Sequence, residues 1–123
     1  MALPHAGLLD VINVAPLGAA LAVVPSTSLL KTTRVQLLHL VLRAREDQPE
    51  HRVEDECVIH CIEGGVDVIM PGGTRYLAPA QLVVLPAGEP HALRAREADA
   101  AVLVTLLLRG GDAGDGGGAN APR

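Results

Sequence analysis

Residues 85–95, LPAGEPHALRA, form a proline- and glycine-rich turn between two apolar segments. Pro86 and Pro90 stiffen the backbone of this turn, and Gly88 supplies dihedral angles that other residues rarely adopt. His91 ends the turn and begins the next apolar segment. A histidine at this place is consistent with a turn residue, a metal ligand or a catalytic base. The choice depends on which other residues point to the same place.

Short apolar segments separated by turn signals extend from this stretch along most of the chain. The strands expected from this pattern are residues 34–42, 56–64, 65–70, 74–79, 81–86 and 101–108. The sequence PGG at 71–73 is a strong turn signal, so residues 65–78 are expected to form a hairpin. Six or more short strands without a convincing long helix predict an all-β sandwich or barrel.

The two ends of the chain differ from this central region. Residues 1–33 are expected to form an N-terminal arm on the barrel, with a short helical turn followed by an irregular or strand-like entry. Residues 34–108 are expected to form the barrel itself. Residues 109–123 contain six glycines and no large side chain to bury. This tail is expected to be disordered, because it cannot offset the entropy of ordering.

The composition limits the kinds of function that the chain can have. Among 123 residues there is no Trp or Phe, and Tyr76 is the only aromatic residue. A core of Leu, Val, Ile and Ala is therefore expected, with no ring face on which a sugar or base could stack. The net charge of −4 argues against nucleic acid as a partner, because nucleic-acid binding needs a basic surface.

The apolar stretches do not predict a membrane protein. The longest, residues 15–25, is far shorter than the roughly 20 residues that a spanning helix needs. No basic residue precedes it, so it does not resemble a signal peptide, and the cytoplasm is expected. Two cysteines, Cys57 and Cys61, fit a reducing compartment better than a disulfide framework.

Residues 51–63 are expected to form one strand, whose alternating residues divide into two faces. One face carries His51, Val53, Asp55, Cys57, Ile59 and Cys61. The other face carries Arg52, Glu54, Glu56, Val58, His60 and Ile62. On the first face His51 lies at the mouth, whereas Cys57 and Cys61 lie deeper. The cysteines are expected to act mainly as small buried hydrophobic residues.

Residues 86–93 resemble the second sequence motif of the cupins, which has the order P-x-G-x-x-H. Pro86, Gly88 and His91 match that motif. The chain departs from it at Ala80, where the motif begins with glycine, and at Ala95, where the motif ends with asparagine.

The first cupin motif, H-x-H-(x)3–4-E-(x)6-G, is matched less completely. His51 and Gly64 fit its first and last positions, but Val53 replaces the second histidine and Cys57 replaces the glutamate. The resemblance covers about residues 34–108. It implies a double-stranded β-helix, also called a jelly-roll or cupin barrel, of the small single-domain kind.

The resemblance also implies a divalent transition metal, because the family holds Fe, Mn, Ni or Zn with three histidines and one glutamate. Of that set His51 and His91 remain, and Cys57 as a thiolate, or Glu56 turned inward by a β-bulge, would have to complete it. His60 belongs to the other face of the strand, and the direction of His39 stays open.

Three functions remain open at this point. The first is a non-catalytic or sensing barrel that binds a small molecule in a pocket formed by His51, Cys57, Cys61 and His91. The second is a metal-dependent cupin enzyme, dioxygenase-like or isomerase-like, with an atypical metal site. The third is a structural or interaction protein. A homodimer is expected as well, because Val58 and Ile62 are apolar and face outward.

Overall fold

Nine β-strands and one 3-10 helix make up residues 5–109, the part of the chain that this computed structural model describes. The elements are η1 (Gly18–Ala22), β1 (Thr27–Lys31), β2 (Val35–Leu42), β3 (Asp47–His51), β4 (Cys57–Glu63), β5 (Val66–Met70), β6 (Gly73–Leu77), β7 (Leu82–Leu85), β8 (His91–Ala95) and β9 (Ala100–Leu107). The 3-10 helix η1 and the strand β1 lie within residues 1–33, which are expected to form the N-terminal arm. Of the tail expected to be disordered, residues 110–123 lie outside the described residues.

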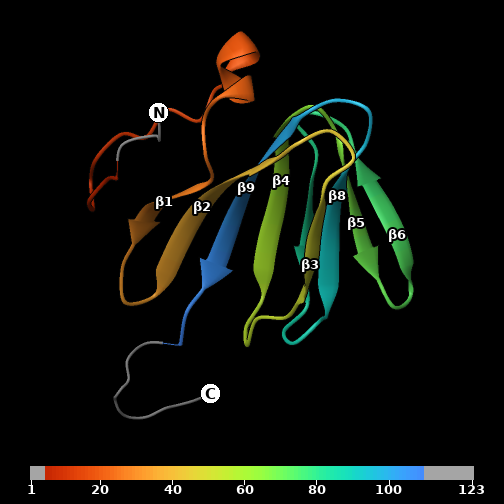
Figure 1. Cartoon of the computed structure of the whole chain (residues 1–123). Coiled ribbons are helices and arrows are strands. Elements are labelled where there is room, and N and C mark those ends of the chain that lie inside the picture. The colour runs from red at the N-terminus through yellow and green to blue at the C-terminus, as the bar shows by residue number, and fades with distance from the viewer. Residues whose placement is uncertain (1–4, 110–123) are drawn as a thin grey trace.

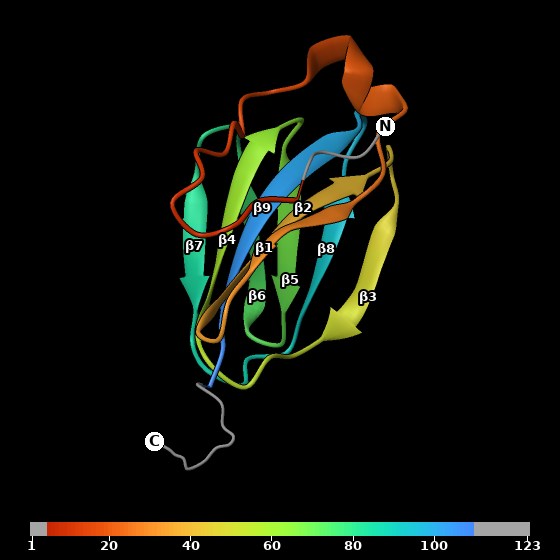
Figure 2. The ribbon, with the colours of Figure 1, turned by 90° about the vertical axis from the view of Figure 1, so that its left-hand side faces the viewer.

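The strands form two antiparallel sheets that face each other (Figures 1 and 2). One sheet has the order β1-β2-β9-β4-β7, and the other has the order β3-β8-β5-β6. Fully buried aliphatic side chains fill the space between the sheets, with Ile59, Val68 and Val102 at its centre. The prediction of an all-β jelly-roll barrel with an aliphatic core is therefore confirmed. No helix in residues 5–109 is long and apolar enough to cross a membrane.

The N-terminal segment covers part of the outer face of the five-stranded sheet (Figure 2). A second apolar cluster lies there, formed by Leu21, Val24, Ile62 and Ala101. The carboxylate of Glu63 holds the segment in place, because it accepts the N–H groups of Leu17 at 2.7 Å and Gly18 at 3.3 Å. Ile62 thus faces outward as expected, but this segment buries it.

The prediction of one strand over residues 51–63 is wrong. β3 ends at His51 and β4 begins at Cys57, and the two strands belong to different sheets. Residues 52–56 cross between the sheets, and the carbonyl of Val53 accepts the N–H of Gly88 at 3.0 Å. The alternation holds within β4, where Cys57, Ile59 and Cys61 face the core, but it cannot be extended back to residue 51 across this crossing.

β5 and β6 form the hairpin expected over residues 65–78. The charged region around residues 43–56 contains the edge strand β3. Only one of the five residues of β3 is even half-buried.

Ala80 adopts a backbone conformation that suits glycine. Its φ angle is +74°, and its N–H donates to the carbonyl of Cys61 at 2.8 Å. The cupin motif has glycine at this position, so the left-handed conformation explains that preference. An L-residue in this region costs roughly 1–2 kcal/mol.

Ala80→Gly is therefore expected to raise the free energy of unfolding by about 1 kcal/mol, after the greater backbone entropy of unfolded glycine is subtracted. Chemical denaturation measures the change. Ala78→Gly is the control, because Ala78 does not have a positive φ and the same substitution there should destabilise the protein. Equal effects at the two positions would contradict the explanation.

Candidate functional site

His51 and His91 lie side by side on the neighbouring strands β3 and β8. They are opposite each other in the strand register, and their ring centroids are 4.5 Å apart at an interplanar angle of 58°. His91 is buried, whereas His51 is exposed at the end of the edge strand. The structure thus brings together the two histidines that the sequence motifs predict for the site.

The backbone fixes which ring nitrogen of His91 carries the proton. Nδ1 of His91 lies 3.1 Å from the carbonyl oxygen of Glu89. Because a carbonyl only accepts hydrogen bonds, Nδ1 must be the donor, and Nε2 of the neutral ring keeps its lone pair. Nδ1 of His51 makes a longer contact of the same kind, 3.5 Å from the carbonyl oxygen of Pro49.

Burial keeps His91 neutral. Desolvation lowers the pKa of His91, and the hydrogen bond to the Glu89 carbonyl partly opposes this. The nearby ring of His51 lowers this pKa by a smaller amount. A neutral His91 offers an acceptor at Nε2 to any O–H or N–H group that approaches it.

Cys57 and Cys61 lie in the core between the sheets, both almost fully buried and both free thiols. Burial raises the thiol pKa of each cysteine. They therefore act as small apolar core residues. A thiolate at Cys57, which the expected metal set could require, is disfavoured by its surroundings.

The residues at this place do not fit a cupin-type metal set. Within residues 5–109 no group of three or more His, Cys, Asp and Glu side chains could hold a metal ion. Val53 has no ligand atom, the thiol of Cys57 is held protonated, and Glu56 is exposed in the crossing before β4.

The other two histidines of the sheet region point away from the barrel interior. His60 alternates with the core residues of β4 and is half-buried on the outer face, as predicted. His39 lies on the outer face of β2, opposite Leu103, which packs against the second apolar cluster. It is buried, and among the described residues its Nδ1 has no hydrogen-bond partner. Burial lowers the pKa of His39, and the carboxylate of Glu63 partly opposes this.

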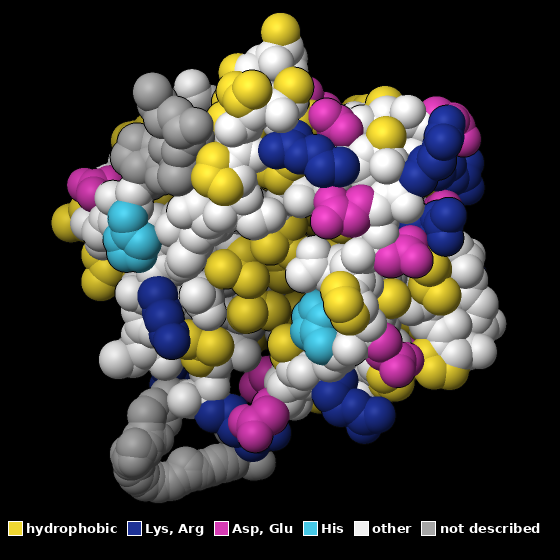
Figure 3. All heavy atoms as spheres, in the orientation of Figure 1, with side chains coloured by type: hydrophobic (Ala, Val, Ile, Leu, Met, Phe, Trp, Pro, Cys, Tyr) yellow, Lys and Arg dark blue, Asp and Glu magenta, His cyan; other side chains and the backbone are white. Residues whose placement is uncertain are grey.

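The barrel is open on one side. Figure 3 shows a hollow between the five-stranded sheet and β3, with hydrophobic side chains on its floor and a histidine on its rim. The partly buried hydrophobic residues against the core are Leu38, Leu40, Val53, Met70, Val83 and Leu106. Near the end of β3 lies a cavity of about 300 Å³, whose lining is both apolar and charged: Arg52, Val53, Glu54, Leu106, Leu107, Leu108 and Arg109.

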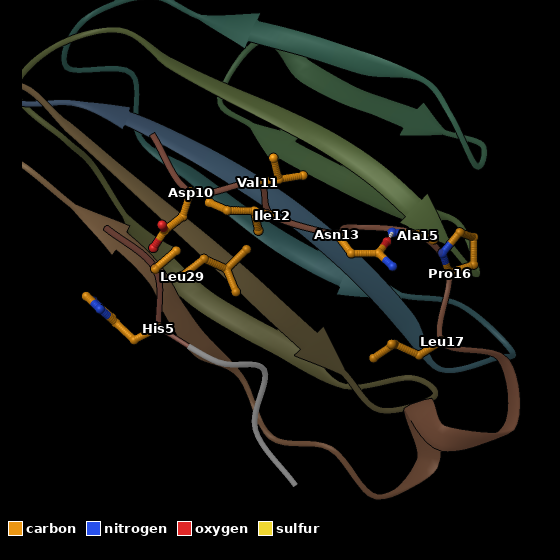
Figure 4. A pocket seen from close by; sticks show the side chains of 10 residues that line it. His5, Asp10, Val11, Ile12, Asn13, Ala15, Pro16, Leu17 and Leu29 are labelled. Carbon is orange, nitrogen blue, oxygen red and sulfur yellow. Dashed lines mark hydrogen bonds between the residues drawn. The ribbon is translucent and has the colours of Figure 1, made fainter. Parts of the chain in front are cut away.

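A larger cavity, of about 500 Å³, lies next to the N-terminal segment and is lined mainly by residues 5–17 and Leu29 (Figure 4). Its acidic and amide side chains are already used by the segment itself. Asp10 accepts the N–H of Gly7 at 2.8 Å, and Asn13 accepts the N–H of Ala15 at 2.9 Å. The histidine pair is the better candidate, because Nε2 of His91 is not committed to a turn.

Two facing antiparallel sheets with these strand orders form a small cupin barrel. Residues 38–116 match the AraC-like ligand binding domain, and the chain belongs to this family.

Solved structures support the same fold. A cupin superfamily protein from Desulfitobacterium hafniense has a TM-score of 0.64 at 19% identity, over 68% of this chain and 75% of that chain. KdgF from Halomonas sp. has a TM-score of 0.62 at 21% identity, over 68% and 77%. TT1209 from Thermus thermophilus has a TM-score of 0.62 at 26% identity, over 69% and 85%. No curated protein matches the sequence.

Proposed function

We propose that this barrel binds a small molecule in the hollow between its sheets and does so without catalysis, as a binding or sensing module. The observation that carries the proposal is the pair of His51 and His91, with ring centroids 4.5 Å apart. The description of the family as ligand binding supports it. The buried thiols favour a binding role over catalysis, because a protonated thiol is a poor nucleophile.

The lining of the hollow indicates the kind of ligand. Its floor is aliphatic, and Tyr76, the one aromatic residue of the chain, lies on the surface against Arg96. An aliphatic body is favoured, because no ring face is available for stacking. The neutral imidazole of His91 accepts a hydrogen bond, so the ligand needs an O–H or N–H donor.

The test is a titration of the protein with short aliphatic alcohols, diols and hydroxy amides, followed by NMR of the histidine rings. We expect at least one compound to shift the His91 signals. In His91→Gln the affinity should fall about 10-fold, the value of one buried hydrogen bond. His60→Gln is the matched control, because His60 lies on the outer face, and it should bind as the parent does. A panel in which no compound binds, or binding that His91→Gln leaves unchanged, would refute the proposal.

We further propose that the chain pairs as a homodimer through the outer face of β4 and β7. Val58 and Val84 are opposite each other there, and the side chains of Val84 and Leu82 are about half exposed, 53% and 54%. Ile62 cannot contribute, because the N-terminal segment covers it. Exposed apolar patches of this kind favour association. Sedimentation showing only a monomer at micromolar concentration would rule this out.

A further inference from the structure

β3 contains an irregularity that changes which of its side chains face the barrel. Gln48 is opposite Leu93 of β8, and His51 is opposite His91. Residues three apart in a regular strand lie on opposite faces of a sheet. In β3 the register shifts between Gln48 and His51. These two residues are three apart in β3, whereas their partners Leu93 and His91 are two apart in β8.

The shift places Gln48 and His51 on the same face. His91 and Leu93 are two apart in the regular strand β8, so they share a face, and both are buried. Their partners across the ladder share that face as well. The burial of β3 agrees with this, because Gln48 is its one half-buried residue and the other four are exposed.

Gln48 is therefore a third polar group on the wall that carries the histidine pair. Neighbouring side chains on one face of a strand are about 7 Å apart, so the side chains of Gln48 and His51 can both reach one small molecule. No hydrogen bond of the Gln48 side chain is found within residues 5–109, whereas Gln36, the half-buried glutamine of β2, donates to Ser28 at 3.2 Å. The amide of Gln48 thus keeps both its N–H donors and its carbonyl acceptor for a ligand.

We propose that Gln48 determines the specificity of the hollow, and that the ligand carries a carboxamide for Gln48 next to a hydroxyl for His91. An amide both donates and accepts, so it can form two matching hydrogen bonds with a glutamine side chain. A hydroxyl donates to Nε2 of the neutral His91 ring. This inference rests on the proposed function and adds to it the chemical class of the ligand, a short aliphatic hydroxy amide.

The probe is 3-hydroxypropanamide, compared with 1-propanol, which keeps the hydroxyl and lacks the amide. We expect the parent protein to bind the amide about 10-fold more tightly than the alcohol, the value of one added hydrogen bond. Gln48→Leu should bring this ratio close to one and leave the affinity for 1-propanol nearly unchanged. Gln36→Leu is the matched control, because it removes the half-buried glutamine of the other sheet, and it should keep the full ratio.

The outcomes separate the inference from the proposed function. If the parent protein binds 1-propanol through His91 but shows no preference for the amide, or if Gln48→Leu keeps the preference, the role of Gln48 is refuted and the binding function stands. If neither compound binds in a way that depends on His91, both are refuted for this class of ligand. Thermal melting of each variant verifies that it is folded.

Discussion

Replacing Gly64 by alanine is expected to lower the free energy of unfolding by roughly 3–5 kcal/mol. This loss combines the strain of a left-handed backbone conformation with the forced movement of packed atoms. Gly64 has a φ angle of +87°, where a Cβ atom is disfavoured. A Cβ atom there would also meet the backbone of Asp99 and come within 2.7 Å of the Cα atom of Ala100. These are backbone atoms at the entry to β9, so they cannot turn aside as a flexible side chain can.

Chemical denaturation of Gly64→Ala beside Gly72→Ala tests this prediction. Gly72 lies in the turn between β5 and β6 and has no positive φ angle. A Cβ atom added there would have no other atom within 4 Å. Gly72→Ala should change the stability by a few tenths of a kcal/mol at most, or raise it slightly. A loss of less than about 1 kcal/mol in Gly64→Ala would show that the turn before β5 adapts more easily than its geometry indicates.

Lowering the pH from 7.5 to 5.5 is expected to destabilise the fold through His39 and His91. Burial lowers the pKa of both histidines in the folded protein. In the unfolded chain they take up protons near their ordinary pKa of about 6.5. The unfolded state therefore binds more protons as the pH falls below that value, and stability decreases. Each histidine contributes at most about 1.4 kcal/mol per pH unit.

The double variant His39→Gln/His91→Gln isolates this effect. Its absolute stability will differ from that of the parent, so the quantity to compare is the change in unfolding free energy between pH 7.5 and 5.5. We expect that change to be clearly smaller in the variant, because glutamine does not titrate. If parent and variant lose the same stability over this range, other groups cause the acid sensitivity.

The sequence determined the fold class and most of the strands. Prolines and glycines break the chain into short apolar segments, and their spacing is readable without any tertiary contact. Turn chemistry was reliable at residues 71–73, where the hairpin formed as expected. Alternation was reliable inside β4, because Cys57, Ile59 and Cys61 face one core. The resemblance to the cupins at Pro86, Gly88 and His91 agreed with the fold that was found.

Part of the candidate site could also be predicted. His51 and His91 were named from the motifs, and the structure places their rings together. The reason given for His51 was nevertheless wrong. Its position follows from its pairing with β8, and alternation from residue 51 to residue 63 does not apply, because the strand ends at His51 itself.

The tertiary structure alone decided the rest. Only the pairing with β8 shows that Gln48 and His51 share a face, because a register shift reverses the alternation. Pro49 in DQPEH is typical of an edge strand or a bulge, but it does not show which side chains face the barrel. Only the packing shows that Glu56 is exposed and that the surroundings of Cys57 raise its thiol pKa. Both depend on neighbours from distant parts of the chain. Local sequence predicts where most of the strands lie, but the facing of a side chain and the charge of a buried group depend on the partners that folding brings next to them.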